Sequence, residues 1–269
     1  MIHKLIQLDP RSPEVYLEVY AADRVGDYTS KAILVIPGGG YSQVCAAREG
    51  EPIALAFLRH GFNAFVLHYS VAGKKYFPGQ LIEASMAMKH IKDHHEEYNI
   101  DPEQVYVVGF SAGGHLAGSL GTMWHKQEVY DAVPMPFGYN KPAGMMLIYP
   151  VISGVEKFGH LHSFYNLLGG KETTQEQLAM CSIERNVDER TVPAFLFHTS
   201  NDPVVDVRNS LTLGAAMKAA GKTFEMHIYP DGPHGMALAN QITRCGNPRY
   251  VSAAMEKWVD MAAAWTDSL

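Results

Sequence analysis

Short, almost continuously apolar runs recur along this chain, and longer segments with helical periodicity separate them. A bounded apolar run of roughly four to eight residues is typical of a strand that is buried on both faces of a sheet. The pattern predicts strands at residues 15–20, 32–36, 64–69, 105–108, 144–149, 194–199 and 224–229. It predicts helices at residues 51–60, 80–98, 114–124, 207–220 and 250–265.

This alternation of strands and helices predicts an α/β fold. A strand that is followed by a helix returns to the sheet parallel to its predecessor, so we expect a mostly parallel, twisted sheet with helices on both faces. Only the first strand or two is expected to run antiparallel. The polar segment 153–191 lacks a strand pattern. We therefore expect it to form a small cap insertion above the sheet, within a single domain spanning residues 1–269.

Composition and charge narrow the range of partners. The chain has 269 residues, 47% of them hydrophobic, and a formal net charge of −6. Since it has no cluster of Lys and Arg, neither nucleic acid nor an anionic membrane is the expected partner. No apolar run approaches the ~18 residues that a membrane span needs, and the first ten residues lack the features of a secretory signal, so a cytoplasmic location is expected. The sequence leaves open whether the chain forms a homo-oligomer.

The three cysteines predict free thiols. Cys45, Cys181 and Cys245 are odd in number and far apart, and none of them belongs to a CxxC pair. Such a set is simplest to explain in a reducing compartment.

A GxSxG pentapeptide, Gly109-Phe-Ser-Ala-Gly113, stands between the strand at 105–108 and the helix at 114–124. A strand that reverses sharply into a helix places the central serine in strained backbone angles and needs small neighbours. Ser111 would then lie exposed at a helix N-terminus, where the N–H of Ala112 faces a developing oxyanion. The alternative is a glycine-rich turn with an incidental serine.

A serine nucleophile needs a base, and the base needs a carboxylate to orient it. Asp202 lies just beyond one late strand, and His234 lies in a Pro/Gly-rich turn beyond the last strand. Both positions fall at the sheet edge where ligands bind in α/β folds. Asp206 is the rival acid, because Asp202 could instead form a turn or cap the following helix. His198 is expected to support the site from behind Asp202.

Other histidines raise a metal hypothesis. His90 and His94 lie four residues apart on a predicted helix, next to His95. No acidic motif such as HExxH accompanies them, so a solvated helix face is favoured, and His160 and His162 form an equally weak pair. The sequence therefore predicts no metal and no organic cofactor.

The triplet in Pro37-Gly-Gly-Gly-Tyr41 follows an early strand. Three consecutive glycines are costly to order, and they make sense where bare backbone must approach a ligand. Their N–H groups, together with that of Ala112, are candidates for an oxyanion hole. A phosphate-binding loop is the alternative, but neither GxGxxG spacing nor a following Gly-Lys-Ser/Thr is present.

With these motifs in place, the chain resembles the α/β-hydrolase superfamily over essentially its whole length. PGGGY is similar to the HGGG element of esterases of the hormone-sensitive-lipase type, with proline in place of histidine. Five segments together resemble bacterial acetyl esterases of the acetylxylan esterase-like, xylanase-associated group; they are PGGGY with REGEP, GFSAGGHLA, YPVI, HTSND and GPHG.

The resemblance implies roles for particular residues. It places the catalytic triad on Ser111, Asp202 and His234, and Gly39 and Gly40 match the second and third glycines of HGGG. Where the family usually has a proline after the paired valines that follow the acid, this chain has Asp206.

The sequence therefore predicts a serine esterase that acts on a small-molecule ester, with small acyl groups such as acetyl and with acetylated carbohydrates as one candidate class. A formamidase or small-peptide hydrolase is the alternative enzyme. A hydrolase-fold protein that only binds a ligand is the alternative outside catalysis.

Overall fold

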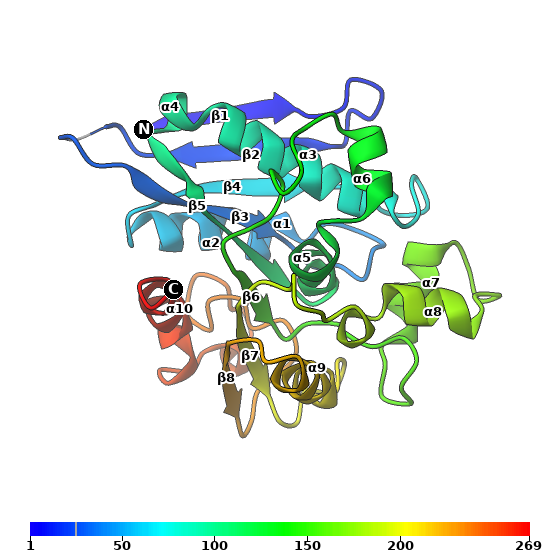
Figure 1. Cartoon of the computed structure of the whole chain (residues 1–269). Helices are drawn as coiled ribbons and strands as arrows, with labels where there is room; N and C mark the ends of the chain where they lie inside the picture. Colours follow the sequence, from blue (N-terminus) through cyan, green and yellow to red (C-terminus); the bar gives the residue numbers. More distant parts are fainter. Residues whose placement is uncertain (25) are drawn as a thin grey trace.

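A computed structural model describes residues 1–24 and 26–269. These residues form an eight-stranded sheet in the order β1-β2-β4-β3-β5-β6-β7-β8 (Figure 1). The strands are β1 (Ile2–Gln7), β2 (Tyr16–Ala21), β3 (Ser30–Ile36), β4 (Phe62–His68), β5 (Ile100–Phe110), β6 (Met145–Ile148), β7 (Ala194–Thr199) and β8 (Phe224–Tyr229). β1 and β2 pair antiparallel, β2 pairs antiparallel with β4, and every later pair is parallel. The predicted α/β fold with a mostly parallel sheet is confirmed.

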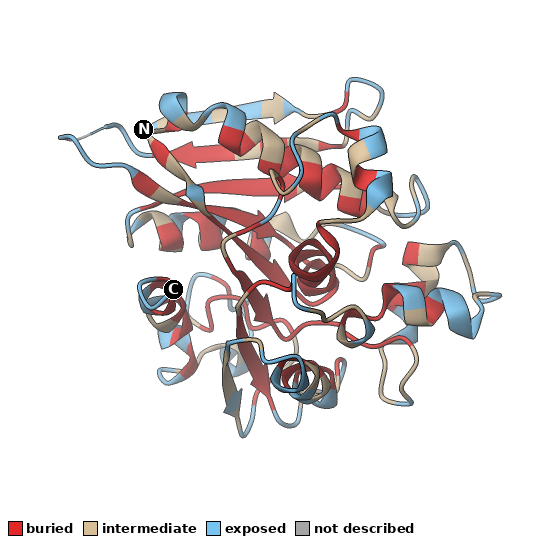
Figure 2. Cartoon of the chain, viewed as in Figure 1, coloured by how far each residue is buried: buried red, intermediate tan, exposed pale blue. Residues whose placement is uncertain are grey.

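Helices cover both faces of this sheet, and alternate side chains of each strand pack against them. Leu34 of β3 belongs to the apolar core on one face, whereas its neighbours Ile33 and Val35 belong to the core on the other face. Successive side chains of a strand point to opposite faces, so a strand that is covered on both sides is apolar at every position. Figure 2 shows the resulting burial along the central strands and α5.

The helices divide between the two cores. Those packed on the first face are α3 (Gly79–Asp93), α5 (Ala112–Met123) and α9 (Arg208–Ala219), and those packed on the second are α2 (Glu51–Leu58) and α10 (Trp258–Thr266). The shorter helices are α1 (Ala46–Glu49), α4 (His95–Tyr98), α6 (Gln127–Ala132), α7 (Leu161–Leu168) and α8 (Gln175–Cys181). Three 3₁₀ turns complete the set: η1 (Ile183–Arg185), η2 (Pro248–Tyr250) and η3 (Met255–Lys257).

Three elements differ from the sequence prediction. β1 was not predicted, because its outward side chains include Leu5, which is 65% exposed and obscures the polar/apolar alternation. The helix predicted at 80–98 is interrupted at His94, whose backbone (φ −107°, ψ 25°) leaves the helical region. The last helix begins at Trp258 rather than at residue 250, because two 3₁₀ turns precede it.

The segment 153–191 contains no strand, as predicted, and holds α7, α8 and η1. Figure 1 shows α7 and α8 beyond the carboxyl ends of the parallel strands. α7 buries Ser163, Phe164 and Leu167 and ends at Gly169, which adopts a left-handed conformation. α8 starts with a capping box, in which the Thr174 hydroxyl accepts from the Gln177 N–H and the Gln177 side chain accepts from the Thr174 N–H.

Two further observations concern the described part of the chain. None of its helices is both long enough and apolar enough to cross a lipid bilayer. Cys45, Cys181 and Cys245 are free thiols, of which Cys181 is buried and Cys245 is exposed.

The two-sided core predicts a sharp contrast between two leucines. Leu34→Ala empties a fully buried site in β3, whereas Leu5→Ala makes the same deletion on the exposed face of β1. We expect Leu34→Ala to lower the free energy of unfolding by about 2–5 kcal/mol and Leu5→Ala to change it by less than about 0.5 kcal/mol, as measured by urea denaturation. Equal losses in the two variants would contradict the assigned register and burial.

Candidate active site

Ser111 lies at the turn between β5 and α5, and its backbone is strained. Its φ of 52° and ψ of −117° place it outside the regions that side chains normally occupy. The turn closes only because its neighbours are glycines: a Cβ on Gly109 would lie 2.2 Å from the Gly113 carbonyl oxygen. A Cβ on Gly113 would lie 2.2 Å from the carbonyl oxygen of Ile36. The nucleophile elbow predicted from GxSxG is therefore present, although Ser111 is only 9% exposed, less than the sequence suggested.

Three loops bring Ser111, His234 and Asp202 into one hydrogen-bonded chain. His234 Nε2 lies 2.9 Å from Ser111 Oγ, and His234 Nδ1 lies 2.7 Å from Asp202 Oδ2. The loop after β8 carries the histidine, and Gly235 follows it with a φ of +77° that glycine adopts without strain. The serine, base and acid predicted from sequence thus meet in the order that a base-activated serine requires.

Asp202 is built to remain ionised. Its side chain is only 1% exposed, and Oδ1 accepts hydrogen bonds from the N–H groups of Val204 and Val205, at 2.8 and 2.9 Å. Burial opposes ionisation, but hydrogen bonding from His198 and His234 outweighs it and holds the pKa of the Asp202 carboxyl well below its usual range.

The rival acid points elsewhere. The Asp206 carboxylate pairs with the Arg208 guanidinium at the start of α9, and its side chain is 35% exposed. His198 lies behind Asp202 as predicted, because its Nε2 is 3.5 Å from Asp202 Oδ2 and 2.9 Å from the Val205 carbonyl oxygen.

The glycine loop after β3 is fixed through its carbonyl groups. The Tyr69 hydroxyl donates to the Pro37 carbonyl at 2.8 Å, and the Cys45 N–H donates to the Gly38 carbonyl at 2.9 Å. The Gly39 carbonyl accepts the Ser42 N–H at 3.0 Å. In a trans peptide the next N–H points away from the carbonyl, so anchored carbonyls also fix the N–H groups that follow them.

These N–H groups divide into one that is used and several that are free. The Gly38 N–H donates to the Glu49 carboxylate at 2.9 Å, whereas in residues 1–24 and 26–269 the N–H groups of Gly39, Gly40 and Ala112 donate to no protein acceptor. This division fits the three donors predicted for the oxyanion hole. Gly39 has no room for a side chain, since its Cβ would lie 2.1 Å from the Gln43 carbonyl oxygen.

Helix α7 contributes neighbours that sequence reasoning missed. The Asn166 side-chain amide donates to the Gly40 carbonyl at 2.7 Å, across 126 residues of sequence. A Cβ on Gly40 would lie 3.9 Å from His162 Cδ2 and from Ser163 Oγ. Burial, followed by the neighbouring His234 and His162, lowers the pKa of His160. No local motif marks these residues, because only the folded position of α7 brings them to the loop.

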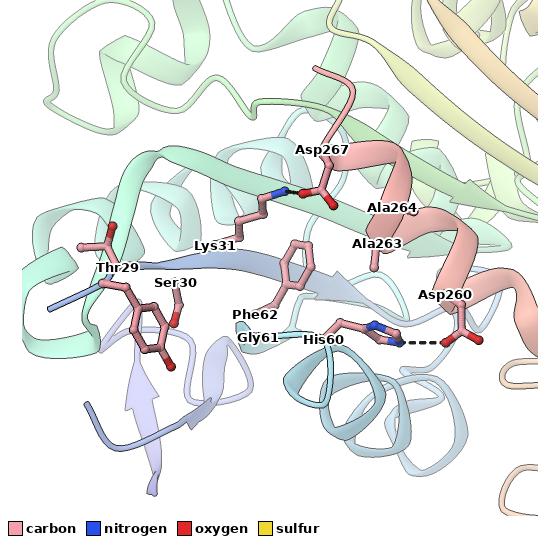
Figure 3. A pocket seen from close by; sticks show the side chains of 11 residues that line it. Thr29, Ser30, Lys31, His60, Gly61, Phe62, Asp260, Ala263, Ala264 and Asp267 are labelled. Atoms are coloured by element: carbon pink, nitrogen blue, oxygen red, sulfur yellow. Dashed lines mark hydrogen bonds and ion pairs between the residues drawn. The ribbon is translucent and has the colours of Figure 1, made fainter. Parts of the chain in front are cut away.

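Two features lie outside this site. His90 and His94 stack on each other with ring centroids 4.0 Å apart, and the described residues hold no group of His, Cys, Asp or Glu side chains arranged to bind a metal ion. A cavity of about 370 Å³ lies at the amino ends of β3 and β4, opposite the strand end that carries Ser111 (Figure 3). His60 and Asp260 pair there at 2.9 Å, and Lys31 pairs with Asp267, so its charges balance each other.

The sheet order, the strained serine elbow and the hydrogen-bonded triad geometry define an α/β-hydrolase. Among solved structures, the acetyl ester-xyloside bifunctional hydrolase from Caldicellulosiruptor lactoaceticus is similar over 99% of this chain and 96% of that one, with a TM-score of 0.83 and 32% sequence identity. The sequence profile of the BD-FAE family matches residues 17–217. The chain therefore belongs to the BD-FAE family, and its relatives place it among the carboxylic ester hydrolases.

Two curated relatives share part of their length with this chain. The endo-1,4-beta-xylanase B of Butyrivibrio fibrisolvens is 37% identical over 218 residues, which cover 80% of this chain and 34% of that protein. The acetylxylan esterase of Xylanibacter ruminicola is 31% identical over 214 residues, which cover 78% of this chain and 42% of that protein. The chain thus spans less than half of either relative.

The geometry predicts which carboxylate serves the histidine. Asp202→Asn removes the acceptor for His234 Nδ1–H and leaves the ring in the wrong tautomer, a change that costs about 10⁴-fold in kcat in the serine proteases. We expect a loss of similar order in ester hydrolysis, measured as kcat on p-nitrophenyl acetate. Asp206→Asn is the matched control and should retain near-normal kcat. A crippled Asp206→Asn beside an active Asp202→Asn would reverse the assignment.

Proposed function

We propose that this protein is a serine esterase that hydrolyses small acyl esters, acetyl esters above all, through Ser111, His234 and Asp202. The observation that carries the proposal is the continuous hydrogen-bonded chain from Ser111 Oγ through both ring nitrogens of His234 to Asp202 Oδ2, at 2.9 and 2.7 Å. A serine hydroxyl is a weak nucleophile at neutral pH, and this arrangement supplies the base that activates it.

The geometry leads to a two-step reaction. Ser111 Oγ attacks the acyl carbon while its proton passes to His234 Nε2, and the carbonyl oxygen gains the negative charge. The N–H groups of Gly39, Gly40 and Ala112 bind that oxygen. His234 then returns the proton to the alkoxide that leaves as alcohol, and an acyl-serine remains. Water gives a proton to His234 and attacks the acyl carbon, which releases the acid and restores Ser111.

The alcohol part of the substrate meets a polar surface. On the side of the glycine loop that faces α7, His162 and Ser163 are the neighbours of Gly40. Polar side chains of this kind suit a hydroxylated acceptor. An acetylxylan esterase and an acetyl ester-xyloside hydrolase are among the relatives. We therefore propose an acetylated carbohydrate as the small-molecule ester.

The covalent step predicts the effect of one oxygen atom. Ser111→Ala should abolish turnover of p-nitrophenyl acetate, because no acyl-enzyme can form, and should also abolish labelling by a fluorophosphonate. Ser119→Ala removes a hydroxyl from the same helix α5, where Ser119 Oγ donates to the His115 carbonyl, and serves as the control. It should keep both properties. Turnover by Ser111→Ala of more than a few per cent of the normal rate, in protein with an unchanged melting temperature, would reject the mechanism.

Acyl size provides a separate prediction. α7 turns its apolar side chains Phe164 and Leu167 into the core, so the segment lacks an apolar face for a long acyl chain. Each methylene that a pocket cannot accept forfeits about 1–3 kcal/mol. We expect kcat/KM on p-nitrophenyl esters to fall steeply from acetate through butyrate to octanoate. A flat or rising series would point to a lipase-like groove, and faster cleavage of formanilides or peptide anilides would point to an amidase.

A further inference from the structure

A buried carboxylate lies directly beneath the candidate active site. Glu49, at the end of α1, is 2% exposed, and both of its oxygens accept hydrogen bonds. Oε2 accepts the Gly38 N–H and Oε1 accepts the Tyr149 hydroxyl, each at 2.9 Å. The Arg48 guanidinium is its ion-pair partner, at 4.0 Å. A carboxylate is costly to bury, so a site that keeps one must hold it through specific partners.

Tyr149 extends this connection to the loop that carries the histidine. Its hydroxyl accepts the Ala237 N–H at 2.9 Å, three residues beyond His234, and its ring packs edge-on to the His234 ring at 5.0 Å. Burial, and then the charge of Glu49, raise the pKa of Tyr149 well above its usual value. The phenol therefore stays protonated and donates to the carboxylate.

Gly38 carries the connection in the other direction, to the nucleophile. A Cβ on Gly38 would lie 2.9 Å from Glu49 Oε2 and 3.0 Å from Ser111 Cβ. The loop backbone is thus packed between the carboxylate and the serine with no space for even a methyl group. Any shift of Glu49 moves this loop relative to Ser111, and with it the N–H of Gly39.

We infer that Glu49 is a positioning residue that fixes the oxyanion loop and the His234 loop relative to Ser111, through Gly38 and Tyr149. The inference deepens the proposed function and rests on it. A donor hole must be in place before charge develops on the substrate oxygen, so a displaced loop weakens the transition state more than the bound substrate.

The test compares two buried glutamates. Glu49→Gln keeps the shape of the side chain, but an amide offers only one acceptor where two donors meet the carboxylate. Glu83→Gln is the matched control: Glu83 is fully buried and accepts the Ser70 N–H at 2.8 Å, the Ser70 hydroxyl at 2.6 Å and Lys75 Nζ at 3.0 Å. Both variants should lower the melting temperature.

Only Glu49→Gln should change the chemistry. We expect its kcat on p-nitrophenyl acetate, and its rate of fluorophosphonate labelling, to fall about ten- to hundredfold, less than the loss of an oxyanion donor itself. KM should change by less than about threefold, because the loss is confined to the transition state. Glu83→Gln should keep both rates within about twofold of the wild type once compared as folded protein.

A second variant makes the test independent of folding at position 49. Tyr149→Phe keeps the ring and removes only the hydroxyl, and it should reproduce the loss in kcat. The double variant should lose less than the product of the two single effects, since both act through one network. Normal kcat and normal labelling in folded Glu49→Gln and in Tyr149→Phe would overturn the inference while the wild-type rate still supports the esterase. A wild type that is neither labelled nor active on acetate would overturn the proposed function, and the inference with it.

Discussion

The left-handed backbone of Ser111 is the constraint on which the rest of the site depends. A non-glycine residue at a φ of 52° is unfavourable by about 1–3 kcal/mol, and it persists only where the surroundings determine it. Here they do so by contact and by hydrogen bonds. The Ser111 N–H donates to the Ile148 carbonyl, and its carbonyl accepts the N–H groups of His115 and Val151. Gly109 and Gly113 allow the strand and helix to approach closely enough for these bonds to form.

The order of strands in the sheet explains how distant loops meet at this serine. β5 lies between β3 and β6, and β6 is followed by β7 and β8. The glycine loop follows β3, the serine follows β5, the acid follows β7 and the base follows β8, all at the carboxyl ends of parallel strands. Such ends lie at one edge of the sheet, which is where α/β proteins bind their ligands. The 123 residues between Ser111 and His234 are thus closed by topology.

Local pattern was enough to predict the elements and residues that depend on local physics. Each of the seven predicted strands is present, because strands covered on both faces are apolar throughout. The triad was predictable because each member follows directly after a strand. β1 was missed, since one of its faces is solvated and carries Leu5. Glu49 and Asn166 were missed for another reason: their partners, Gly38, Tyr149 and Gly40, are fixed by tertiary structure, and no spacing in the sequence reports those contacts.

Those tertiary contacts share one physical effect, which is to settle the direction of N–H groups before a substrate arrives. Water could solvate an oxyanion, but it would have to reorient as the charge forms, whereas fixed backbone dipoles need no such reorganisation. In this chain the anchors come from different parts of the fold: Tyr69 holds Pro37, Glu49 holds Gly38, and Asn166 holds Gly40. A loop with three glycines has high conformational freedom when unrestrained. The anchors remove that freedom, so glycine can provide close approach to the substrate without the disorder that would otherwise accompany it.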